Sequence, residues 1–307
     1  MPIRCAGLAF LLPLAGTVAT AASAQSPAVR WLGDPPVSGG IQWLEVAVPG
    51  AAADSVTGRF DGAPVAFFQV GESWIAAAAV RVATRTAASA TITIHRGNTR
   101  SVLIRSLPVT GRGFRSSRLT VARQFTETPR GELAERIALE RELVAPLGGE
   151  ALATPRLFDA PFVRPGAGVI TDEFGVARVL NRSVRSRHYG VDFDGRVGDE
   201  VRAANRGVVM LVDDLYYSGT SIYLNHGAGL ITAYFHLSEA LVSVGDTVTA
   251  GQLIGRIGAT GRVTGPHLHW MVRVGDRPVD GGTLLVLPPP GVGGWGAGAR
   301  GSQGANP

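Results

Sequence analysis

Turn-forming residues interrupt the sequence at short intervals, and this spacing constrains the fold more than any other feature. Between about Ile41 and Leu107, short apolar or alternating runs are separated by turns such as Asp61–Gly62. The run Ala90–His95 alternates apolar and polar residues, as expected of a half-buried strand. Glycine (41) and proline (19) make up about a fifth of the chain, which favours turn-rich β-structure over long helices. Residues 28–110 are therefore predicted to form a small β-sandwich.

One segment has the pattern of a helix. Glu132–Val144 places three apolar residues on one face and two Glu–Arg pairs four residues apart. Pro129 lies before it and Pro146 after it, as is common at helix ends. We expect this helix to connect two domains within a linker at 111–155. A role in binding a partner is the alternative, without specific support.

The first 24 residues have the three regions of a secretory signal peptide. A basic start is followed by an apolar stretch and by the small-x-small site Ala22–Ala24. An uncleaved anchor is the alternative, but Pro13 and many small residues make a poor membrane span. No span is expected in the mature chain, which we predict to be exported to the periplasm or cell envelope. Residues 288–307, rich in glycine and proline, are predicted to be a disordered tail.

A second domain is predicted at 157–287, where a seven-residue pattern occurs twice. Residues 197–203 (VGDEVRA) are echoed by residues 244–250 (VGDTVTA), each a Gly-Asp turn that enters a strand. Two such hairpins suggest a compact β-barrel sandwich. Lipoyl and biotinyl carriers have similar patterning, but they need a modified lysine. All 29 basic residues of this chain are arginines, so that class is excluded.

Five of the six histidines lie in this second domain, four of them in motif-like surroundings. In the strand-like run Pro266–Val274, His267 and His269 are two residues apart and face the same side, about 6.6 Å from each other. His188 and Asp192 would be about 13 Å apart on a straight strand, but the intervening Gly190 allows the chain to bend. Each pattern alone is more often an ordinary strand than a metal site.

Together these motifs resemble the lysostaphin/LytM-type zinc peptidoglycan endopeptidases. The resemblance rests on HYGVD at 188–192, YFHLS at 234–238, GATG at 258–261 and GPHLH at 265–269, in that order. It covers about 130 residues. The upstream β module resembles, in general pattern only, the immunoglobulin-like domains that precede some of these peptidases. The segment 169–175 is more acidic than the serine-rich version common in the family.

The resemblance implies a role for five side chains. His188, Asp192 and His269 match the three zinc ligands, which leave one position of a tetrahedral site open. His236 and His267 match the two non-ligand histidines that flank the attacking water. His267 would take a proton from this water, and His236 would hold the water or donate to the developing oxyanion. His226 is expected to have a structural or surface role. The glycines at 258, 261 and 265 are expected to shape a loop beside the substrate groove.

The sequence therefore predicts an all-β protein with an N-terminal β-sandwich, a connecting helix and a C-terminal zinc peptidase domain. Its predicted function is that of a secreted zinc metalloendopeptidase that hydrolyses amide bonds in peptidoglycan peptide stems or cross-bridges. Peptidoglycan is the expected partner, and no nucleic-acid partner is expected. The net charge of +5 suits an anionic polymer. Two alternatives remain open: a non-catalytic envelope activator of another murein hydrolase, and a metal-free carbohydrate-binding module.

Overall fold

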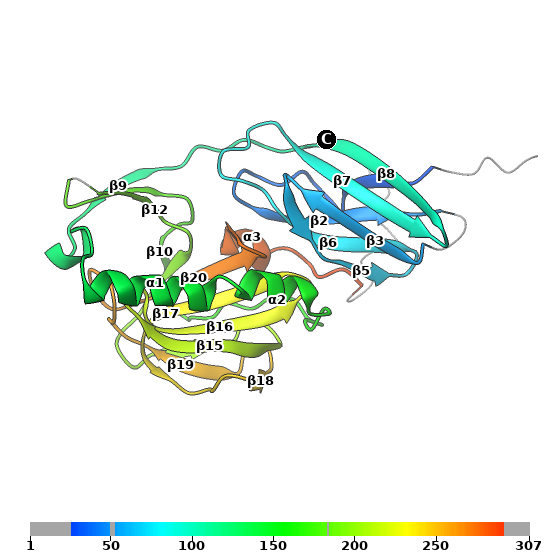
Figure 1. Cartoon of the computed structure of the whole chain (residues 1–307). Coiled ribbons are helices and arrows are strands. Elements are labelled where there is room, and N and C mark those ends of the chain that lie inside the picture. Colours follow the sequence, from blue (N-terminus) through cyan, green and yellow to red (C-terminus); the bar gives the residue numbers. More distant parts are fainter. Residues whose placement is uncertain (1–25, 50–52, 183, 292–307) are drawn as a thin grey trace, which may run out of the picture.

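The computed structural model describes residues 26–49, 53–182 and 184–291. The chain is mostly β-structure, with an N-terminal β region, a connecting helix and a C-terminal sheet domain, so the predicted fold class is confirmed (Figure 1). The predicted signal segment 1–24 lies outside the described residues, as does most of the predicted tail. The predicted domain boundaries remain a proposal.

Two four-stranded antiparallel sheets form the N-terminal region. Their orders are β1-β2-β6-β5 and β4-β3-β7-β8. Ala90, Ile92 and Ile94 are buried between the sheets, on the side that the alternating pattern predicts. The strands are β1 (Ala28–Trp31), β2 (Ile41–Ala47), β3 (Ser55–Phe60), β4 (Ala63–Val65), β5 (Phe67–Val70), β6 (Ser73–Ala79), β7 (Ala87–Arg96) and β8 (Thr99–Pro108).

The outer face of the β1-β2-β6-β5 sheet packs against the C-terminal region. The Trp43 ring stacks on Phe158 with centroids 5.7 Å apart, and its indole N–H donates to the Pro288 carbonyl at 2.8 Å. The carbonyl of Pro290 accepts a hydrogen bond from Arg156 at 2.8 Å. The described start of the predicted tail is therefore packed against both regions. Because both faces of β2 are buried, the sandwich shares a hydrophobic core with the C-terminal domain.

The connecting segment contains a short strand and two helices. These are β9 (Ser116–Leu119), a 3₁₀ turn (Arg123–Phe125), α1 (Glu132–Val144) and α2 (Leu147–Ala153). The predicted helix is confirmed as α1, but it does more than connect, because it lies along the C-terminal domain (Figure 1). Its Glu140 carboxylate accepts a hydrogen bond from the backbone N–H of Tyr216 at 2.9 Å. Leu147 and Ala151 of α2 are buried against β16 and β17.

A ten-stranded sheet forms the C-terminal domain. Its main order is β10-β13-β20-β17-β16-β15-β18, with β14, β19 and β21 attached to it. The elements are β10 (Ile170–Asp172), β13 (Val191–Asp194), β14 (Glu200–Arg202), β15 (Gly207–Leu215), β16 (Gly219–Gly227), β17 (Leu230–Ala240), β18 (Thr247–Val248), β19 (Leu253–Ile257), β20 (His267–Val274), β21 (Arg277–Val279) and α3 (Gly281–Leu285).

The two VGD copies adopt the same turn, with Gly198 at φ +95° and Gly245 at φ +93°. In each turn the aspartate accepts a hydrogen bond from a backbone N–H three residues earlier, at 2.7 and 2.8 Å. The predicted local hairpins are wrong, however. The strand after the first turn, β14, pairs with β19, and the strand after the second, β18, pairs with β15. Each copy therefore pairs with the strand that follows the other copy, so the repeat closes the domain by long-range contacts.

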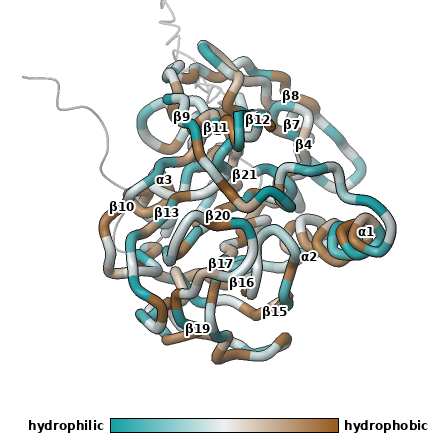
Figure 2. The backbone as a smooth tube through the Cα atoms, turned by 90° about the vertical axis from the view of Figure 1, so that its left-hand side faces the viewer, coloured by the Kyte–Doolittle hydropathy of each residue, from teal (hydrophilic) through white to brown (hydrophobic). Residues whose placement is uncertain are grey.

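A small separate sheet, β12-β11-β9, lies beside the edge of the large sheet. It joins β11 (Ala177–Leu180) and β12 (Val184–Arg187) to β9, which comes from the connecting segment and runs parallel to β11. Figure 2 shows these three strands above β13 and β20. Within the described residues, none of the helices is long and apolar enough to cross a membrane.

Candidate metal centre and active site

The strand register of the large sheet brings three of the predicted site residues together. In the antiparallel pair β13–β20, Asp192 lies directly opposite His269, and Asp194 lies opposite His267. On the other side of β20, Phe235 of β17 lies opposite His269, and the two rings stack with centroids 5.4 Å apart. The buried cross-strand position therefore fixes both the place and the plane of the His269 ring.

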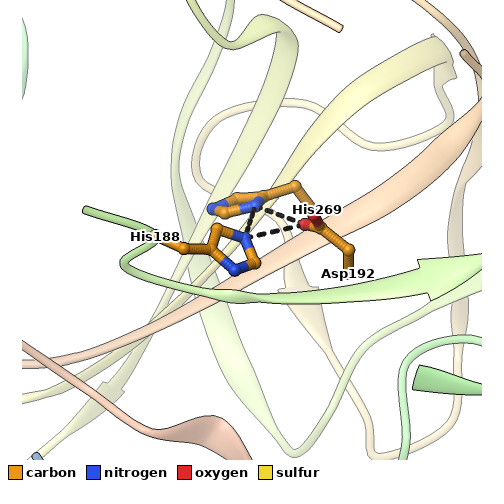
Figure 3. A group of neighbouring side chains, drawn as sticks. All are labelled: His188, Asp192 and His269. Carbon is orange, nitrogen blue, oxygen red and sulfur yellow. Dashed lines mark hydrogen bonds and ion pairs between the residues drawn. The ribbon is translucent and has the colours of Figure 1, made fainter. Parts of the chain in front are cut away.

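His188 reaches the same point from the segment between β12 and β13. Its Nε2 lies 2.9 Å from the Asp192 Oδ1 and 2.9 Å from the His269 Nδ1. The third side of this triangle, from His269 Nδ1 to Asp192 Oδ1, is 2.7 Å (Figure 3). Two imidazole nitrogens and one carboxylate oxygen thus converge from β13, from β20 and from the segment before β13.

Gly190 makes this convergence possible, in agreement with the predicted bend. A Cβ atom at this position would lie 2.5 Å from the His269 Nε2 and 2.7 Å from the Trp270 carbonyl oxygen. Only glycine therefore lets the chain pass β20 closely enough for His188 to point back at Asp192. The side chain of His188 is 1% exposed, so the bend also buries the imidazole.

His236 occupies a strained position next to the triangle. Its φ of +64° lies in the left-handed region, which is unfavourable for a residue with a side chain. The pairing of β17 with β20 ends at Phe235, immediately before it. The His236 Nδ1 donates to the Thr260 carbonyl at 2.8 Å, which leaves Nε2 as the nitrogen available to the site. The GATG loop therefore orients the His236 ring.

His267 is oriented in the same way. Its Nδ1 donates to the Gly265 carbonyl at 2.8 Å, and its Nε2 lies 3.8 Å from the Asp192 Oδ1. The ring centroids of His236 and His267 are 4.9 Å apart, and those of His236 and His269 are 5.9 Å apart. All five residues predicted from the sequence thus lie in one cluster, although their individual roles remain proposals.

Comparison with known families agrees with this arrangement. The model of peptidase family M23 matches residues 186–281, the segment that contains all five residues. The C-terminal domain is an M23 peptidase domain. The M23 domain is similar to Peptidoglycan DD-endopeptidase ShyA of Vibrio cholerae (44% identity over 93 residues) and to DD-carboxypeptidase/endopeptidase Mpg of Neisseria meningitidis serogroup B (37% over 103 residues). These alignments cover 30% and 34% of this chain.

The chain spans only 22% and 24% of the length of these two relatives, so the likeness concerns the M23 domain alone. A solved structure from Pseudomonas aeruginosa, provisionally described as an M23 peptidase, resembles a much larger part of the fold. It has a TM-score of 0.62 and 24% identity, and it covers 83% of this chain and 96% of its own. The arrangement of the β region with the M23 domain therefore occurs in a known structure.

The donor set of the M23 domain fits the metal ion that a metallopeptidase family implies. The carbonyl of Glu173 lies 2.8 Å from the His188 Nδ1 and can only accept, so this nitrogen carries the proton. The His188 Nε2 then presents a lone pair to a carboxylate oxygen 2.9 Å away. Two acceptors at this distance repel each other unless a cation or a proton lies between them. Two imidazole nitrogens and one carboxylate oxygen are typical ligands of zinc.

Burial and hydrogen bonds together set the pKa values of the cluster. Burial raises the pKa of Asp192, but hydrogen bonds with His188 and His269 outweigh it and hold that pKa well below its usual range. Burial also lowers the pKa of His269. Burial together with the neighbouring histidines lowers the pKa of His236 to about 3, so this ring stays neutral near pH 7.

Two arginines border the site, and the sequence motifs did not identify them as functional. Arg178 of β11 forms ion pairs with Asp172 and with the Asp192 Oδ2, the latter at 2.8 Å. The acidic segment that departs from the family pattern is thereby partly neutralised at Asp172. Arg262 follows the GATG loop and lines a small pocket together with Arg178, His236 and His267. No local motif marks Arg178, because its two carboxylate partners lie on other strands, β10 and β13.

His226 lies away from this site and is fully buried. Its Nδ1 donates to the Arg206 carbonyl at 2.7 Å, and its Nε2 lies 2.7 Å from the Thr232 Oγ1. Because the protein itself satisfies both ring nitrogens, the expected structural role is confirmed, in the interior rather than at the surface. Burial lowers the pKa of His226 to about 4.

Proposed function

We propose that the protein is a secreted zinc metalloendopeptidase that hydrolyses amide bonds in the peptide stems or cross-bridges of peptidoglycan. The observation that carries the proposal is the convergence of His188, Asp192 and His269 beside two further histidines whose Nδ1 atoms are already engaged. The name of ShyA, a peptidoglycan DD-endopeptidase, and that of Mpg, a DD-carboxypeptidase/endopeptidase, support this substrate class.

His188, Asp192 and His269 would hold the zinc ion. When bound, zinc would polarise the scissile carbonyl and lower the pKa of a water molecule. His267 would accept the proton of the attacking water at Nε2, because its Nδ1–H already donates to the Gly265 carbonyl. Arg178 would hold the second oxygen of Asp192 in place, so that only Oδ1 faces the donor triangle.

His236 would hold the water rather than donate to the oxyanion. Its Nδ1–H is bonded to the Thr260 carbonyl, so the neutral ring has only an acceptor at Nε2. A donor role would require a second proton on a ring whose pKa burial lowers to about 3. The backbone of His236 has a strained left-handed conformation. Such strain is common at functional sites, where it orients a side chain.

The decisive experiment measures metal content and hydrolysis on the same preparation. Purified protein should contain about one zinc per chain. It should also clear a suspension of purified cell-wall sacculi, and a chelator should abolish both properties. Protein that binds zinc but cannot clear sacculi would instead support the envelope activator. Protein without metal would support the carbohydrate-binding module.

We further propose export to the periplasm or cell envelope, with cleavage after Ala24. The intact mass of protein recovered from the envelope should correspond to a chain that begins at Gln25. A mass that retains Met1 would indicate an anchor instead.

A further inference from the structure

Two positive charges lie in the same small pocket as the catalytic histidines, and they are not equivalent. The pocket is lined by Arg178, Arg262, Asp192, His236 and His267, among others. The charge of Arg178 is balanced by two carboxylates, those of Asp172 and Asp192. Arg262 forms no ion pair with any carboxylate among residues 26–49, 53–182 and 184–291.

Arg262 is held in this position by the fold. Gly261, at φ +72°, lets the loop lie against the start of β16, where a Cβ atom would come within 2.4 Å of the Gly219 nitrogen. The Arg262 backbone N–H donates to the Tyr217 carbonyl at 2.9 Å, and the guanidinium carbon lies 4.9 Å from the centre of the Tyr217 ring. The aromatic ring thus supports the cation but does not neutralise it.

The environment of Arg262 is unfavourable for an isolated cation. Burial lowers its pKa, and the positive charge of Arg178 lowers it further. A guanidinium group does not lose its proton at any physiological pH, so this cost remains until an anion arrives. The pocket has a volume of about 60 Å³, the space of about two water molecules, and this suits a carboxylate better than a sugar or a large side chain.

The adjoining pocket has the opposite character. It has a volume of about 390 Å³ and shares Arg178, Asp192 and His267 with the small pocket, but it adds the carboxylates of Asp172 and Asp194. Because Arg178 balances Asp172 and Asp192, the charge of Asp194 is the one that disfavours a substrate carboxylate there, whereas Arg262 favours one in the small pocket. The asymmetry of charge therefore sets the direction in which a charged peptide lies across the site.

We infer that Arg262 binds a free carboxylate on the carbon that carries the nitrogen of the scissile amide. This inference rests on the proposed function and narrows its substrate. The carboxylate must be adjacent to the scissile bond because the same pocket is lined by His236 and His267. A cross-link between D-alanine and diaminopimelate has such a carboxylate, and so does a terminal D-alanyl-D-alanine. A glycine bridge has none at that carbon.

The test compares Arg262→Gln with the wild-type full chain, both loaded with zinc, on four substrates. These are a cross-linked muropeptide, the same cross-link with this carboxylate converted to a carboxamide, a peptide ending in D-alanyl-D-alanine, and pentaglycine. Wild type should prefer the free carboxylate, and Arg262→Gln should lose about 10- to 100-fold in kcat/KM on it. On the carboxamide the two proteins should be equal. The relative rates on the cross-link and on D-alanyl-D-alanine show whether the bound carboxylate belongs to diaminopimelate or to a terminal D-alanine.

A binding measurement makes the test independent of catalysis. A cross-link analogue with a reduced, non-hydrolysable peptide bond should bind Arg262→Gln about 10- to 100-fold more weakly than wild type in calorimetry. Arg262→Lys should restore part of the affinity, and Arg105→Gln, on β8 of the sandwich, should leave it unchanged. Equal losses on carboxylate and carboxamide would overturn the inference. If wild type hydrolyses none of the substrates, the proposed function fails, and the calorimetric comparison still decides whether Arg262 binds the carboxylate.

Discussion

Two ends of the β16–β17 pair each bury a histidine, and the comparison shows what distinguishes a structural imidazole from a reactive one. Near the turn, both ring nitrogens of His226 are satisfied by Arg206 and Thr232. At the other end, Thr260 engages only the Nδ1 of His236, and the ring lines a pocket. The residue type and the burial are the same. The two histidines differ in the contact of Nε2, which lies against Thr232 in His226 and faces a pocket in His236. The following predictions test this difference.

The largest effect is expected from His269→Ala. This variant removes one of three converging metal donors, so zinc should be lost. Hydrolysis of sacculi should then fall by more than about 10⁴-fold, which exceeds the loss expected when only an acid–base group is removed. Metal analysis and turbidity on one preparation measure both. The matched control is His226→Ala, which removes a fully buried imidazole outside the cluster and should keep its zinc. Retention of zinc and activity by His269→Ala would place the metal elsewhere.

The next effect separates metal ligands from proton carriers. His267→Ala and His236→Ala should keep zinc, while activity falls by about 10²- to 10⁴-fold, the usual contribution of a positioned acid–base group. Zinc content and rate should be measured together on each variant. If His267→Ala loses zinc and His269→Ala keeps it, the two roles are exchanged.

Arg178→Gln should have an intermediate effect. Without the ion pair to its Oδ2, Asp192 is free to rotate, and zinc affinity should weaken by about 10- to 100-fold. Competition with a chromogenic chelator measures this affinity. Arg118→Gln, on the exposed side of the neighbouring β9, is the control and should retain wild-type affinity. An unchanged affinity in Arg178→Gln would show that the ion pair does not position the ligand.

The smallest effect on activity is expected at His226. His226→Gln should leave the hydrolysis rate of the folded enzyme within about twofold of wild type. The free energy of unfolding should fall by about 1–3 kcal/mol, because a buried hydrogen-bond partner is lost. Chemical denaturation at pH 7 measures the change. A loss of hydrolysis rate as large as that of His236→Ala would contradict the purely structural role of His226.

Wild type and His226→Gln also test the titration of His226. Its pKa is about 4 in the fold and about 6.5 in the unfolded chain, so the unfolded state binds more protons between these values. The contribution of His226 is therefore complete above about pH 6.5 and is lost as pH falls towards 4, by up to about 1.4 kcal/mol per unit. His226→Gln should show a shallower decline than wild type. Equal slopes would contradict this.

Several features of the site could be predicted because they are local. The alternation in HLH places His267 and His269 on one face of a strand, since the side-chain period of a strand is two. Gly190 indicated a bend, and the close approach of His269 explains why only glycine fits. The turns of the VGD repeat were also predictable, but their pairing was not, because each strand selects a partner about 40 to 60 residues away.

The sequence alone determined the turn-rich β class and the connecting helix, because short-range patterns encode them, and it indicated the five residues of the cluster through the resemblance of its motifs to a known family. Tertiary structure alone decided which carbonyls orient His236 and His267, how β9 joins the sheet beside the site, and where Arg178 and Arg262 lie. These features depend on strand register and on loops that meet across the fold. An arginine carries the same local signal whether its partner is water, a carboxylate ligand or an empty pocket, so only the folded chain distinguishes these cases.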